Sequence, residues 1–164
     1  MMLGMSLSTF TTVHVIISLV GIGSGLIVMF GMLSAKRLNG WTALFLLTTV
    51  LTSVTGFGFP FTHITPGHKV GVISLVVLAI TLLARYSFHM VGKWRWIYVV
   101  TAIIAEYLNV FVLVVQAFEK VPALTALAPT QSEPPFLVAQ LVVMALFIVL
   151  TIFAVKKFYP DAGR

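Results

Sequence analysis

The chain contains no cysteine and little charge, and both shortages narrow its chemistry. Without cysteine, disulfides, thiolate nucleophiles, iron–sulfur ligation and c-type haem attachment are excluded. Charged residues make up only 9% of the 164 residues, whereas soluble domains carry about 25%. Hydrophobic residues make up 60%, and the mean hydropathy is +1.11. This composition predicts a single membrane domain, residues 1–164, whose core is helix packed against helix within lipid.

Charge is also missing from the start of the chain, where no Asp, Glu, Lys or Arg precedes Lys36. A cleaved signal peptide has a basic n-region and a shorter apolar core. The N-terminal segment is therefore expected to remain in the mature protein as a membrane span.

Five apolar segments reach about 20 residues, the length that a hydrocarbon core of about 30 Å requires of a helix. They comprise residues 12–33, 41–60, 68–90, 96–118 and 136–155. Residues 119–135 form the one long connection, in which Pro122 favours the start of a short helix. The predicted fold class is an all-α bundle of five transmembrane helices.

The basic residues predict how this bundle is threaded through the membrane. With the N-terminus outside, the inner loops and the cytoplasmic C-terminal tail hold Lys36, Arg37, Arg85, Lys93, Arg95, Lys156, Lys157 and Arg164. The outer loops then hold only Lys69 and Lys120, as the positive-inside rule requires. Because these residues form no basic face with interleaved exposed aromatics, the expected partner is the lipid bilayer and not nucleic acid.

Several stretches of the chain carry a resemblance. The sequences LTSVTGFGFP, ARYSF, YLNVFVLVVQAF and VPALTALAPTQSEPPF are similar to those of a widespread group of small polytopic bacterial inner-membrane proteins. The resemblance implies a multi-pass protein of the bacterial cytoplasmic membrane. It implies no particular substrate, cofactor or catalytic residue.

The segment 96–118 has polar residues near its middle. At 100° per residue, Glu106, Asn109 and Gln116 fall within one sector of about 80°. A charged residue at this depth costs roughly 2.5–3.5 kcal/mol on insertion scales, so another helix, a second copy or a ligand must receive this face. The predicted polar site adds Thr52 and Thr55 of the second segment and Gln140 of the fifth.

Two further features concern helix contacts. Gly21 and Gly25 have the G-x-x-x-G spacing that lets two helices approach closely, which predicts a packing face. Arg85 lies about one turn inside the cytoplasmic boundary. We expect it to extend to the headgroups, with an ion pair to Glu106 as the alternative.

Three functions remain open at this point, beside a membrane-embedded enzyme acting on lipid, for which no catalytic constellation is recognisable. The first is an accessory or assembly subunit of a membrane complex, with Glu106 protonated and hydrogen-bonded to a neighbouring helix. The second is an oligomeric proton- or ion-coupled channel or transporter, in which Glu106 is the titratable group. Both predict a homo-oligomer or a larger membrane complex.

The third hypothesis is a haem- or metal-binding redox protein. Imidazole is the natural ligand for iron, copper and zinc when thiolate is absent. His14 and His68 begin spans on the predicted outer side, and His63 lies in the loop between them. The pattern predicts haem b or a transition metal held by His14 and His68, with His63 as a third ligand or a supporting group.

Overall fold

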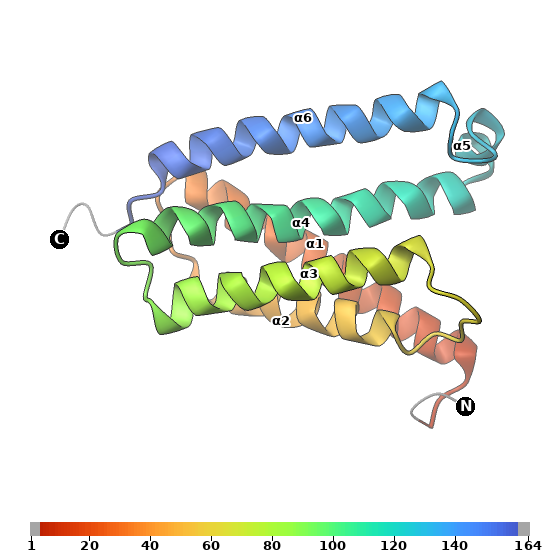
Figure 1. Ribbon diagram of the computed structural model, residues 1–164, viewed down its shortest axis with the longest axis horizontal. Helices are drawn as coiled ribbons and strands as arrows, with labels where there is room; N and C mark the ends of the chain where they lie inside the picture. The colour runs from red at the N-terminus through yellow and green to blue at the C-terminus, as the bar shows by residue number, and fades with distance from the viewer. Residues whose placement is uncertain (1–3, 161–164) are drawn as a thin grey trace.

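The computed structural model describes residues 4–160, which form helices joined by loops and contain no β-strand (Figure 1). Its helices are α1 (Leu7–Leu33), α2 (Asn39–Gly56), α3 (Pro66–Leu82), α4 (Lys93–Lys120), α5 (Pro122–Leu127) and α6 (Pro134–Lys157). A π-helical turn, η1 (Leu83–Ser87), continues α3. The long helices run alternately in opposite directions, so the start of α1 lies at the same end of the bundle as α5 (Figure 1). We call this end the α5 end.

Four helices of the described range are long and apolar enough to cross a membrane. They are α1, α3 with η1, α4 and α6, which agree with four of the five predicted segments. The predicted all-α membrane class is thus confirmed by length and composition. The remaining segment forms α2, which has 18 residues and many hydroxyl side chains. At 1.5 Å per residue its length is about 27 Å. Its crossing of the membrane stays a prediction.

Two predicted segments end earlier than their hydropathy suggested. The segment 68–90 stops being helical after Ser87, because His89 and Met90 take positive φ angles of 50° and 57°. The segment 41–60 stops being helical at Gly56, before a loop that contains Gly58 and Pro60. A left-handed backbone cannot continue a right-handed helix, and proline cannot supply the next hydrogen bond.

Helix α4 forms the centre of the bundle. It packs against α1, α3 and α6, while α1 packs along α2 (Figure 1). Tyr98, Val99, Ala102 and Ile103 of α4 are all buried in the shared apolar core. Helix α6 is peripheral, with only three residues buried among its 24. Arg164, assigned above to the cytoplasmic tail, lies outside the described residues.

Candidate functional site

The Glu106 side chain is completely buried, with 0% of its surface exposed. It projects from the middle of α4 towards Gly25 of α1 and Phe45 of α2. A Cβ atom added to Gly25 would overlap Oε2 of Glu106 and would lie 2.9 Å from Cδ2 of Phe45. The absence of a side chain at position 25 therefore makes the room that the carboxyl group occupies.

Asn109 joins Glu106 to α2. Its Nδ2 donates to Oγ1 of Thr49 over 3.1 Å and, more weakly, to Oε2 of Glu106 over 3.4 Å. The other carboxyl oxygen, Oε1, is buried and has no hydrogen-bond partner in the described part of the chain. Three helices therefore meet at one polar cluster, which we call the Glu106 cluster: Glu106, Asn109 and Thr49, with Gly25 against them.

The second glycine of the α1 pair faces the same neighbour. A Cβ atom on Gly21 would lie 3.2 Å from Oγ1 of Thr48 and 3.4 Å from Oγ1 of Thr49. Gly21 and Gly25 thus lie on the face of α1 that meets α2, and Gly25 also accommodates a side chain from α4.

The predicted residues Thr52 and Thr55 follow Thr49 along α2, each three positions further towards the α5 end. Oγ1 of Thr55 lies 2.8 Å from Nδ1 of His14 and donates to the Leu51 carbonyl over 2.6 Å. Since its one proton is used there, Thr55 accepts a hydrogen bond from Nδ1–H of His14. Oγ1 of Thr52 is buried and, within residues 4–160, has no partner. These groups lie between the Glu106 cluster and the α5 end.

The two predicted glutamines lie elsewhere. Gln140 of α6 donates from Nε2 to the Phe111 carbonyl over 3.2 Å, between α4 and α6. Gln116 is exposed near the end of α4 and donates to Oε2 of Glu119 over 3.1 Å. Their hydrogen-bond partners, Glu119 and the Phe111 carbonyl, therefore lie outside the Glu106 cluster.

The histidines on this side have different neighbours. His14 packs edge-on against Phe59, while His68 caps α3 through Thr65 and contacts Phe57 and Phe61. His63 is exposed and contacts Thr62. Among the described residues, no three His, Asp or Glu side chains are placed to hold a metal ion. The three histidines are thus not gathered as three ligands of one metal ion, and the arrangement with His14 and His68 alone as ligands stays a prediction.

Arg85 is buried rather than extended to the headgroups, with 6% of its surface exposed. It donates to Oδ1 of Asn39 over 2.7 Å and to the Arg37 carbonyl over 3.4 Å, and its guanidinium lies 5.0 Å from the Tyr98 ring centre. These contacts belong to the end of the bundle opposite α5. Neither position expected for Arg85 is seen. Its guanidinium binds Asn39 and the Arg37 carbonyl, and Glu106 accepts a hydrogen bond from Asn109.

Thr49 is the member of the cluster that was missing from the predicted site. The available signal was the run of hydroxyls on α2, but the sequence does not indicate which of them meets Asn109. The geometry defines a helical membrane protein with a carboxyl group enclosed where α1, α2 and α4 meet. Comparison with protein-family models, with curated proteins and with solved structures gives no match for this chain.

Proposed function

We propose that the protein is a multi-pass subunit of the bacterial cytoplasmic membrane that supports the assembly of a larger complex. In this proposal all five long helices cross the bilayer, with the N-terminus outside and the C-terminus in the cytoplasm. The positive-inside distribution of Lys and Arg supports this orientation. The resemblance to small polytopic bacterial inner-membrane proteins supports the location.

The observation that carries the proposal is the complete enclosure of Glu106 by the helices of its own chain. Burying an unpaired carboxylate is far more unfavourable than burying a neutral polar group with a hydrogen-bond donor. We therefore infer that the side chain of Glu106 is a neutral carboxylic acid, and that it fixes how α1, α2 and α4 pack. Its role in this account is to set the shape of the bundle.

The outer surface of the bundle fits a membrane-embedded subunit. On α6, side chains such as Leu137, Leu146 and Ile152 are 49–58% exposed. On α3, Val72, Ile73 and Val76 are 52–57% exposed. These apolar surfaces are suited to lipid and to helices of neighbouring subunits alike. A copy of this chain or another membrane protein is the partner we propose.

Cross-linking in native membranes followed by purification tests this proposal. The wild type is expected to migrate in a defined assembly larger than the monomer. Glu106→Gln should keep that assembly because the amide is neutral and has the same shape, whereas Glu106→Lys should lose it. Glu119→Lys, a charge reversal at an exposed position, is the matched control and should assemble normally. A wild-type protein that remains monomeric in native membranes would contradict the proposal.

The second candidate function is an oligomeric proton- or ion-coupled channel or transporter. It is favoured by two buried oxygens, Oε1 of Glu106 and Oγ1 of Thr52, that have no hydrogen-bond partner among the residues the structure describes. They lie on a series of polar groups that continues to Thr55 and His14 near the α5 end. Such groups can relay a proton when water enters between them.

Proton flux in proteoliposomes separates the two functions. A proton path through Glu106 predicts flux that Glu106→Gln abolishes and Glu119→Gln leaves unchanged. The subunit proposal predicts the same low flux for the wild type and both variants.

A further inference from the structure

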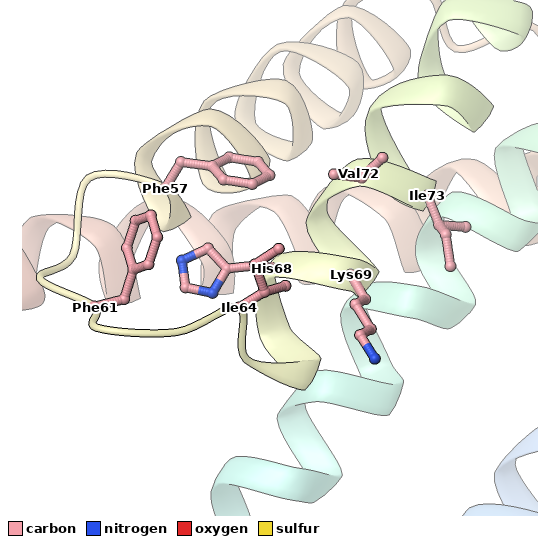
Figure 2. Close-up of a pocket in the computed structure, with 7 residues that line it drawn as sticks. All are labelled: Phe57, Phe61, Ile64, His68, Lys69, Val72 and Ile73. Atoms are coloured by element: carbon pink, nitrogen blue, oxygen red, sulfur yellow. The ribbon is translucent and has the colours of Figure 1, made fainter.

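A pocket of about 510 Å³ opens beside the first turns of α3, at the α5 end of the bundle. Figure 2 shows the rings of Phe57 and Phe61 on one side of it. Ile64, Val72 and Ile73 add aliphatic walls. The pocket is separate from the Glu106 cluster, whose residues do not line it.

His68 holds a hydrogen-bond donor beneath the wall of this pocket, whose exposed lining is apolar. The backbone N–H of Thr65 donates to Nδ1 of His68 over 3.2 Å, so Nδ1 is an acceptor and the neutral ring carries its proton on Nε2. Nε2 is buried without a partner in the described range. The ring projects towards Phe57 and Phe61, with centroid distances of 5.6 and 4.3 Å (Figure 2). An unsatisfied buried donor costs about 1–3 kcal/mol, which an acceptor oxygen entering the pocket would relieve.

The charge around the pocket is positive. Lys69 is exposed at its rim, with the ammonium group directed away from the ring of His68 (Figure 2). The first turn of α3 has no acidic residue, and the N-terminus of a helix carries a partial positive charge. A ligand with an anionic head and an acceptor oxygen fits these groups.

The apolar walls indicate the rest of the ligand. Val72 and Ile73 are about half exposed, at 53% and 52%, and continue along a helix that is long and apolar enough to span the membrane. Lys69 lies in the first turn of that helix, which in the proposed threading is the level where lipid headgroups begin. A ligand with its head at Lys69 would lay a hydrocarbon chain along Val72 and Ile73.

We propose that this pocket binds one anionic phospholipid. Lys69 and the start of α3 attract the phosphate, Nε2–H of His68 donates to an ester carbonyl, and one acyl chain lies against Val72 and Ile73. The site rests on the proposed threading of α3 but not on the proposed assembly, because all its residues come from α3 and from the loop that joins α2 to it.

Native mass spectrometry of the full chain in detergent tests this site, with phosphatidylglycerol or phosphatidylcholine added. The wild type is expected to retain one phosphatidylglycerol and to retain phosphatidylcholine several-fold less. Lys69→Gln should remove this preference. Val72→Trp should lower retention of both lipids by filling the pocket. His68→Gln keeps a residue able to form the capping box with Thr65 but withdraws the ring donor, and should also lower both.

Two controls use residues that do not line the site. Lys120→Gln removes a cation at the same end of the bundle, and Leu146→Trp adds an indole to the exposed face of α6. Both should retain lipid as the wild type does, and circular dichroism should show equal helix content throughout. Equal lipid retention by all variants would overturn the proposal. A mass that shows a bound fatty acid or quinone in place of a phospholipid would also overturn it.

Discussion

The carboxyl group of Glu106 occupies the space that a side chain on Gly25 would need. This contact joins the G-x-x-x-G face of α1 to the polar face of α4. Phe45 and Thr49 of α2 complete the enclosure. The small residue and the acid therefore belong to one packing unit, and a change at either position acts on the other.

Substitution of Gly25 tests that unit. Gly25→Ala places a methyl group against Glu106 and Phe45, and overpacking of this kind typically costs about 1–3 kcal/mol. Gly23→Ala is the matched control, because nothing lies within 4 Å of a Cβ atom at that position. Thermal unfolding in detergent should show a clear loss of stability for Gly25→Ala and no loss for Gly23→Ala. Equal melting of the two variants would show that α1 and α4 do not approach as described.

Asn109 is expected to contribute through its amide group. Asn109→Leu keeps a similar volume but removes the donor to Thr49 and Glu106, so buried oxygens lose their partner at a cost of about 1–3 kcal/mol. Gln116→Leu, at an exposed position on the same helix, should change stability little. The two unfolding midpoints give the comparison, and a Gln116→Leu effect as large as that of Asn109→Leu would count against the cluster.

The absence of native cysteine makes the proposed threading directly measurable. Lys36→Cys lies in the loop before α2, and Thr62→Cys lies in the loop after it. In intact cells a membrane-impermeant maleimide should label position 62 and leave position 36 unlabelled until the membrane is opened. Labelling of both positions from the same side would show that α2 does not cross the bilayer.

The loop before α6 is expected to respond to acid. The pKa of the Glu133 carboxyl is lowered, mainly by the hydrogen bond that the Thr130 hydroxyl donates over 2.8 Å. A lowered folded-state pKa means that the ionised carboxyl stabilises the loop above the ordinary glutamate pKa of about 4.3. That stabilisation is lost as the pH falls through the folded-state value.

Hydrogen exchange of the Thr130 amide, which also donates to Glu133, measures this effect. At neutral pH the amide should exchange more slowly in the wild type than in Glu133→Gln. The difference should vanish below the folded-state pKa. A difference that persists at low pH would mean that the carboxylate is not its source.

The helices were predictable from sequence because a long apolar segment in lipid has few alternatives to a helix. The helix ends were less so, since the left-handed backbone at His89 and Met90 has no proline or glycine to announce it. Within the site, the three-residue spacing predicted that Glu106 and Asn109 share a face.

The neighbours of Glu106 and Asn109 depend on the rotation and depth of the other helices. Thr49 and Gly25 meet Glu106 because of how α1 and α2 pack, which helical periodicity does not contain. For the same reason Gln140 was grouped with Glu106, although it contacts Phe111 on the side of α4 that faces α6.

The most direct test of the enclosed neutral Glu106 is the infrared difference spectrum between the wild type and Glu106→Gln in lipid at neutral pH. An enclosed neutral carboxyl group should give the carbonyl band of a protonated carboxylic acid, and this band should be lost in the variant. The band should also shift slowly after transfer to heavy water, because the bundle shields the group. A carboxylate band in its place, or an immediate shift in heavy water, would contradict the account.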